Sequence, residues 1–363
     1  MGLIVAIIAV VGIWYGVNRK SVEKETISIG FIGPLTGSGA AYGINPKKAM
    51  DLAVEEINSS GGINGKIISI IYEDDQANPA TAVSAAHKLI DLDKVSVIFS
   101  ITSASSLAIT PITEKAKIIL FSPAVAHPSY SEAGDYTFRN RPSITLEIQT
   151  ISNFAKEKYR KAAILYTNKD PYPKIQEIFQ KEFQQNNSEV AVIESAEAET
   201  KDFRTQLVKI KNTNPDVIFF ALYSPKENGL AMKQARELSI KVPFLSMVAI
   251  QNPEFVQTSG GAGESVVYAA FVSSTSEDFI SNYKAKYNEK PGLFAPEAYD
   301  AVKIIALGIK KCGIDSDCIK EYLYKIKDYP GVSGITTFDE KGDVSKPVEI
   351  KIVKNGQFVP YEK

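Results

Sequence analysis

Residues 26–59 read TISIGFIGPLTGSGAAYGINPKKAMDLAVEEINS, and this stretch decides the fold class. Its first eight residues alternate apolar and small side chains, which predicts a strand. Asn45 and Pro46 then predict the start of a helix, with Asn45 as the N-cap and Pro46 at the first helical position. A strand that leads at once into a helix with one apolar stripe is the building unit of α/β proteins.

The same pattern recurs outward along the chain. Short apolar runs predict further strands at residues 66–72, 95–100, 118–122, 162–166, 217–222 and 242–246. Helical patterns separate most of these runs, which indicates a parallel sheet covered on both faces. Since one series precedes Pro142 and another follows it, we expect two similar lobes. Ligands of such sheets bind beyond the carboxyl ends of the strands.

Length and charge set the limits of the functional classes. The 363 residues suggest two domains, and 44% hydrophobic with 23% charged residues is ordinary for a globular protein. The formal net charge is −1. Because no basic field exists to attract phosphates, a nucleic-acid partner is not expected.

The N-terminal segment differs from the rest of the chain. Gly2 to Val17 is an unbroken run of apolar, aromatic and glycine residues, followed by Arg19 and Lys20. We interpret residues 1–25 as a signal peptide or an uncleaved membrane anchor, which implies an extracytoplasmic protein. A buried N-terminal helix is the alternative, but the aromatic pair at 14–15 suits a membrane interface better.

The chain has two cysteines, Cys312 and Cys318, on either side of a turn-like stretch between two helical patterns. A disulfide at this place would join the end of one helix to the start of the next, and it would agree with export to an oxidising compartment. A pair of reduced thiols is the alternative. A metal site is not expected, because neither of the two histidines lies near these cysteines.

Catalytic motifs are incomplete. The glycines at 37, 39 and 43 follow a predicted strand, but their spacing departs from the dinucleotide fingerprint. No Gly-x-Ser-x-Gly elbow is present. His127 follows a predicted strand and borders a ligand in one interpretation, although an exposed loop histidine is the favoured one. We therefore expect neither an enzyme nor a cofactor.

Six motifs give the chain a family resemblance. They are Gly30–Ala53, Glu55–Gly65 (EEINSSGGING), Tyr72–Pro79 (YEDDQANP), Phe121–Pro128 (FSPAVAHP), Ala295–Val302 (APEAYDAV) and Gly334–Pro347. Through them the chain resembles the periplasmic leucine/isoleucine/valine-binding protein family over nearly all of its length after Thr26.

The resemblance implies a type I periplasmic-binding-protein fold, with two Rossmann-like lobes joined by three crossing segments near Pro142, Val272 and Thr336. Lobe one would contain 26–141 plus 273–335, and lobe two 142–272 plus 336–363. The ligand would lie between lobes that close by a hinge, and the loaded protein would deliver it to an ABC permease. A sensor domain that acts with a separate signalling partner is the alternative.

The resemblance also implies the site residues. Ser103 opens a predicted helix and would hold a ligand carboxylate, with capping of the helix as its alternative role. The backbone of Ala124 would contact the ligand, and Ala126 would lie beside it. Three aromatic side chains would line the space between the lobes: Tyr42, Tyr172 and Tyr223.

Three positions depart from the amino-acid-binding pattern. Ala126 replaces a Thr or Ser, Ile144 an Asp, and Val248 the acidic residue that holds a ligand ammonium group. An unpaired ammonium between closed lobes would be costly. These departures favour a carboxylate without an amine, an aromatic acid or an amide as the ligand.

Overall fold

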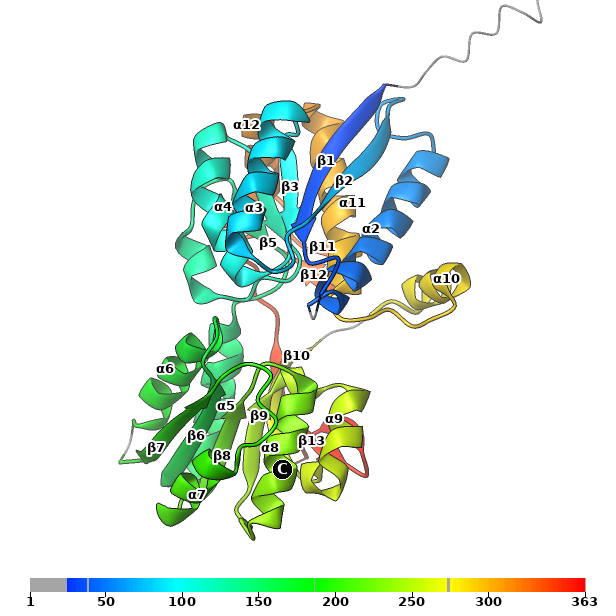
Figure 1. The fold of residues 1–363 in the computed structure, drawn as a ribbon. Coiled ribbons are helices and arrows are strands. Elements are labelled where there is room, and N and C mark those ends of the chain that lie inside the picture. Colours follow the sequence, from blue (N-terminus) through cyan, green and yellow to red (C-terminus); the bar gives the residue numbers. More distant parts are fainter. Residues whose placement is uncertain (1–24, 38, 186, 273–274, 363) are drawn as a thin grey trace, which may run out of the picture.

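Two α/β lobes, one above the other, make up the computed structural model (Figure 1). It describes residues 25–37, 39–185, 187–272 and 275–362. The expected signal peptide or anchor at 1–25 lies outside this part of the chain except for Glu25. Among the described residues no helix has both the length and the apolar character that a membrane span requires.

Lobe one is built on a five-stranded parallel sheet. Its strands, in spatial order, are β2 (Ile67–Asp74), β1 (Thr26–Gly33), β3 (Val97–Ser100), β4 (Ile119–Ser122) and β5 (Thr137–Arg139). Its helices are α2 (Ala41–Ser59), α3 (Pro79–His87), α4 (Ser103–Ala116), α10 (Glu277–Tyr287), α11 (Ala295–Cys312) and α12 (Ser316–Tyr324). A short hairpin, β11 (Tyr329–Gly331) with β12 (Gly334–Thr336), follows α12.

Helices cover both faces of this sheet, which explains why its strands are almost wholly apolar. Ile27, Ile29 and Phe31 of β1 lie in one core with α2, α10, α11 and α12. The next residue, Ile32, and Ile98 of β3 lie in a second core with α3 and α4. Successive strand residues therefore serve opposite cores, as the alternation of a strand requires.

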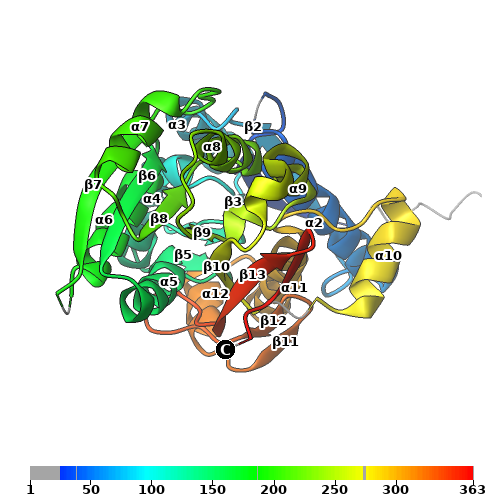
Figure 2. The same cartoon turned by 90° about the horizontal axis from the view of Figure 1, so that it is seen from below.

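Lobe two has a seven-stranded sheet. In spatial order its strands are β14 (Gln357–Pro360), β13 (Val348–Lys354), β10 (Val267–Phe271), β9 (Phe244–Met247), β8 (Val217–Ala221), β6 (Lys161–Thr167) and β7 (Glu189–Ala196). Its helices are α5 (Ile144–Lys158), α6 (Tyr172–Phe183), α7 (Arg204–Asn212), α8 (Pro225–Glu237) and α9 (Pro253–Ser259). Figure 2 shows α5 and α6 on one side of the sheet and α8 and α9 on the other. In the described part of this lobe, β13 runs antiparallel to β10 and β14 runs antiparallel to β13.

The chain passes between the lobes three times. The first passage joins β5 to α5, and the second lies between β10 and α10. The third follows β12, keeps Phe338 and Val344 in the lobe-one core, and then enters β13. The second and third passages touch each other, because the amide of Val272 donates to the carbonyl of Pro347 at 2.8 Å.

The start of α2 differs from the prediction. The helix begins at Ala41, and Pro46 lies inside it. The amides of Gly43 and Ile44 already donate to the carbonyl of Ala40, at 3.1 and 2.8 Å. Gly43 permits this early start, because a β-carbon there would lie 2.0 Å from the carbonyl oxygen of Pro34. Tyr42 therefore lies on the first turn of α2, which follows the carboxyl end of β1.

The predicted disulfide is confirmed: Cys312 at the end of α11 is bonded to Cys318 in α12. Asp315 caps α12 inside the closed loop, since its carboxylate accepts from the amide of Cys318 at 3.0 Å. The bond therefore fixes the tight turn between two helices that both cover the lobe-one sheet.

Replacing both cysteines by serine is expected to lower the free energy of unfolding by about 2 kcal/mol, because a short closed loop removes only a limited amount of chain entropy. Urea unfolding of the double variant and of the oxidised protein measures the difference. The oxidised protein treated with reductant is the control, and it should fall to the same value. An unchanged stability in both would contradict the prediction.

Candidate ligand-binding site

Three tyrosines meet between the lobes. Tyr42 comes from α2 of lobe one, Tyr172 begins α6, and Tyr223 follows β8 in lobe two. The ring centroids of Tyr42 and Tyr223 are 6.4 Å apart, and those of Tyr172 and Tyr223 are 6.1 Å apart. Both pairs have edge-to-face geometry, which aromatic rings favour. All three residues follow the carboxyl ends of parallel strands.

A fourth ring and a guanidinium extend this group, and sequence reasoning missed both. Phe294, just before α11, stacks on Tyr42 with a centroid distance of 6.2 Å. The guanidinium carbon of Arg141 lies 4.6 Å from the Phe294 centroid. We call Tyr42, Tyr172, Tyr223 and Phe294 the interlobe aromatic cluster. Arg141 belongs to the first passage between the lobes, two residues after β5.

Burial raises the pKa of two tyrosine hydroxyls of the cluster. It raises the pKa of Tyr42 to about 12, with a further contribution from Tyr223. It raises the pKa of Tyr172 well above its ordinary value as well. The Tyr172 hydroxyl donates to the carbonyl of Tyr223 at 3.0 Å, which holds the two lobe-two rings in place. Tyr42 and Tyr172 therefore offer apolar ring faces and uncharged hydroxyls.

Ser103 is the first residue of α4, as predicted from its position after a strand. Thr102 precedes it in an extended conformation, and no side chain caps the helix at this residue. The Thr102 hydroxyl oxygen is buried and has no hydrogen-bond partner among the described residues. Since α4 is 14 residues long, its first-turn amides and positive dipole end remain available to an anion.

The loop after β4 carries Ala124 and Ala126. The hydroxyl of Ser122 accepts from the amides of Ala124 and Val125, at 3.2 and 3.0 Å. The carbonyl of Ala126 accepts from the amide of Ile144 at 2.8 Å, which ties this loop to the start of α5 in the other lobe. Ala126 also shares a core with Ile144 and Tyr172.

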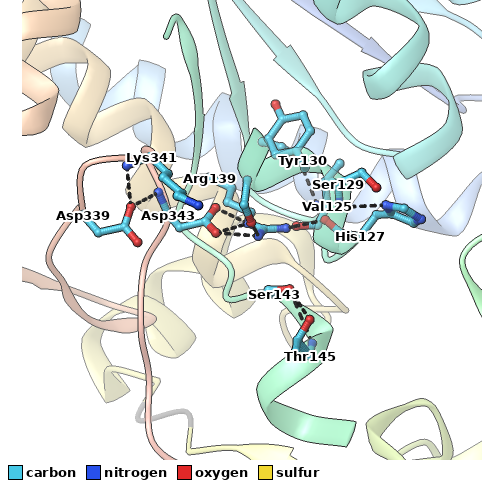
Figure 3. Close-up of polar contacts among 12 residues, drawn as sticks. Val125, His127, Ser129, Tyr130, Arg139, Ser143, Thr145, Asp339, Lys341 and Asp343 are labelled. Atoms are coloured by element: carbon cyan, nitrogen blue, oxygen red, sulfur yellow. Dashed lines mark hydrogen bonds and ion pairs between the residues drawn. The ribbon is translucent and has the colours of Figure 1, made fainter. Parts of the chain in front are cut away.

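Arg139 holds the far side of the same loop (Figure 3). Its side chain is fully buried, and its Nε and Nη2 atoms donate to the two carboxylate oxygens of Asp343 at 2.6 and 2.7 Å. Nη1 donates to the carbonyl of His127 at 2.9 Å, and Nη2 also donates to the hydroxyl of Ser131 at 2.6 Å. One side chain thereby connects β5, the loop that carries Ala126 and the third passage between the lobes.

His127 is buried, so the favoured interpretation of an exposed loop histidine is wrong. Its Nδ1 accepts from the amide of Ser129 at 3.1 Å, and its Nε2 lies 3.2 Å from a carboxylate oxygen of Asp170 in lobe two. Nδ1 thus acts as an acceptor, and Nε2 is the ring nitrogen next to the carboxylate of Asp170. The histidine thus links the lobes instead of facing solvent.

A buried carboxylate lies close to Ile144 and Val248, the two positions at which the sequence analysis expected acidic residues to be replaced. Glu147, in the first turn of α5, is fully buried, and its Oε1 accepts from the amide of Val248 at 2.8 Å. Its Oε2 has no hydrogen-bond partner among the described residues. Burial raises the pKa of Glu147 to about 7, against an opposing effect of the Val248 amide and of Arg141.

The structure brings the three predicted tyrosines together and adds Phe294 and Arg141 to them. Ser103, Ala124 and Ala126 follow strands β3 and β4, so they lie at the edge of the lobe-one sheet from which Tyr42 also comes. In the described part of the chain no cluster of metal-ligating side chains occurs. The arrangement can bind a small molecule between aromatic faces and hydrogen-bond donors.

Comparison with known proteins places this geometry in a family. The periplasmic binding protein family matches residues 26–357. The chain belongs to this family. The match covers both lobes and all three passages, so the predicted family and the type I periplasmic-binding-protein fold are confirmed. As a periplasmic binding protein, the chain is a binding protein and not an enzyme.

Individual relatives agree with this assignment. The leucine-, isoleucine-, valine-, threonine- and alanine-binding protein of Pseudomonas aeruginosa is 29% identical over 96% of this chain and 92% of its own length. A branched-chain amino acid transporter substrate-binding protein of Streptococcus pneumoniae, solved with isoleucine, is 31% identical with a TM-score of 0.82, over 92% of this chain and 98% of that one. A leucine-binding protein of Thermotoga maritima is 26% identical with a TM-score of 0.83, over 93% and 98%.

Proposed function

We propose that the protein is an extracytoplasmic solute-binding protein, which captures an amino-acid-like or carboxylate ligand between its lobes and delivers it to an ABC permease. The observation that carries this proposal is the interlobe aromatic cluster, to which both lobes contribute. A ligand that contacts Tyr42 of one lobe and Tyr223 of the other stabilises one relative placement of the lobes. Such a placement is a state that a permease can distinguish from the empty protein.

The carboxylate end of the ligand is assigned to the start of α4. A serine hydroxyl and free first-turn amides suit an anion, and no side chain caps this helix at Thr102. The names of the relatives above describe them as amino-acid-binding proteins, and every amino acid carries a carboxylate. The delivery step and the extracytoplasmic location rest on the family, since the relative from Streptococcus pneumoniae is named as a transporter component.

Replacing Ser103 by alanine is expected to weaken ligand binding about 10- to 100-fold, because a hydrogen bond to a charged group contributes about 1.5–3 kcal/mol. A thermal-shift screen of amino acids, aromatic acids and amides first identifies the ligand, since a compound that binds only the native state raises the melting temperature. Isothermal calorimetry with that compound then measures the affinity of both proteins.

Ser84→Ala in the neighbouring helix α3 is the matched control, because its hydroxyl is exposed and bonds only within its own helix. It should leave the affinity unchanged. Equal affinities of the wild type and Ser103→Ala would contradict the placement of the ligand carboxylate at the start of α4. A screen in which no compound raises the melting temperature would count against solute binding of this class altogether.

A further inference from the structure

The guanidinium of Arg141 is a cation without a partner at the interlobe aromatic cluster. It is half-buried and lies over the ring of Phe294. No hydrogen bond or ion pair of this group occurs within the described residues, although it has five N–H donors. Arg139, the last residue of β5, is by contrast bonded to Asp343 and to a neighbouring carbonyl oxygen. A half-buried guanidinium that no carboxylate of the described residues binds is free to receive an anion between the lobes.

Two carboxylates are near Arg141, but neither is bound to it. Glu147 and Glu297 both raise the pKa of the guanidinium by their charge, while burial lowers it. Neither carboxylate lies within ion-pair distance in the described structure. Glu147 is instead held by the amide of Val248. Lys346, which is also buried, adds a second positive charge to this neighbourhood: burial lowers the pKa of its ammonium group, and the charge of Arg141 lowers this pKa further.

The position of Arg141 suits a second group of the ligand, distinct from the carboxylate that lies at Ser103. Its guanidinium lies 4.6 Å from the centroid of Phe294, which in turn stacks on Tyr42, so the positive charge is at the cluster. Ser103 follows β3, whereas Arg141 follows β5, and β4 lies between these strands. With about 4.8 Å between neighbouring strands, the two backbone positions are roughly 10 Å apart.

We propose that Arg141 is a ligand-binding residue that pairs with a second anionic group, so that the ligand is a dicarboxylate or an acidic amino acid. This inference rests on the proposed function and makes its ligand class narrower. One carboxylate lies at the start of α4, the carbon chain or ring lies against the aromatic cluster, and the second carboxylate receives a two-point hydrogen bond from the guanidinium. Arginine matches a carboxylate in this planar geometry, which lysine cannot do.

Four matched pairs of compounds test the inference. L-Glutamate, glutarate, adipate and terephthalate are each compared with the compound in which one carboxylate is an amide (for L-glutamate, L-glutamine). The members of a pair have nearly the same shape and differ by one charge. Calorimetry should show that the wild type binds at least one diacid about 10-fold or more tightly than its monoamide.

Arg141→Gln should lower the affinity for that diacid about 10- to 100-fold and change the affinity for its monoamide less than about 2-fold. Arg141→Lys should restore part of the loss. Arg160→Gln is the control, because Arg160 precedes β6 and therefore lies at the opposite end of the lobe-two sheet. It should leave both affinities unchanged.

The other outcomes overturn the inference in distinct ways. Equal losses for a diacid and its monoamide in Arg141→Gln would mean that Arg141 and Ser103 share one carboxylate. Unchanged affinities would make Arg141 a structural residue that only covers Phe294. If leucine binds and no diacid binds better than its monoamide, the inference fails while the proposed function stands. If neither these compounds nor leucine bind, the proposed function fails as well.

Discussion

Replacing Arg139 by methionine is expected to lower the free energy of unfolding by about 3–5 kcal/mol, the largest stability loss that we predict for this chain. The substitution removes both bonds to Asp343 and leaves that carboxylate, whose side chain is only 15% exposed, without its cation. It also removes the donors for the carbonyls of Val125 and His127, so the loop that carries Ala126 loses its support. Urea unfolding followed by circular dichroism measures the loss.

Two further variants test whether the stability loss comes from the buried ion pair and not from the replacement of an arginine as such. Arg204→Met is the control, because its ion pair with Glu237 is about half exposed and should contribute at most about 1 kcal/mol. The double variant Arg139→Met with Asp343→Leu removes both charges and should recover part of the stability. A loss for Arg139→Met as small as that for Arg204→Met would show that the buried bonds do not stabilise the fold.

Glu147→Gln is expected to remove a pH dependence of about 3 kcal/mol from the free energy of unfolding. Burial raises the pKa of Glu147 from 4.5 to about 7, so the native protein keeps a proton that the unfolded chain releases. Stability from this group is therefore fully present below about pH 4.5 and is lost as the pH rises to about 7. Glutamine has nearly the same shape and cannot ionise, so the variant lacks this loss.

The measurement is the stability difference between wild type and variant at several pH values from 4.5 to 8. As the pH rises over this range, the free energy of unfolding of the variant should increase by about 3 kcal/mol relative to that of the wild type. Glu157→Gln is the control on the same helix, because that side chain is exposed, and it should change stability by less than about 0.5 kcal/mol at any pH. A constant difference for Glu147→Gln would mean that this carboxylate stays ionised throughout.

Strands β1, β2, β3, β4, β6, β8 and β9 were predictable from their apolar runs. Strands β5, β7, β10 and β11 to β14 were not predicted, and neither was one helix start. Two Asn-Pro pairs look alike, and both predict a capped helix. Asn78 does cap α3, since its side chain accepts from the amide of Ala80 at 2.9 Å. Gln76 and Ala77 before it have φ of 52° and 56°, so no helix can include them. The four residues directly before Asn45 are helical instead, and the helix extends back to Ala41.

The candidate site was predictable to the extent that its residues follow strands. Tyr42, Tyr172 and Tyr223 do so in three separate places, and the parallel sheets bring them to the facing ends of the lobes. Arg141 and Glu147 could not be identified in this way, because their significance depends on partners. The sequence does not distinguish an arginine on the surface from an unpaired arginine next to an aromatic ring. Only the distances from Phe294 and Val248 distinguish them.

The three passages between the lobes also determine when each lobe can fold during synthesis. The core that contains Ile29 and Phe31 is closed by α11 and α12, which are made only after all the parallel strands of lobe two. Lobe two in turn lacks β13 and β14 until the ribosome has passed Pro360. Neither lobe can therefore be finished while the other is still unmade. A chain that emerges from its N-terminus keeps apolar strand faces uncovered until residues 295–360 have also been made, and both lobes complete their folding together.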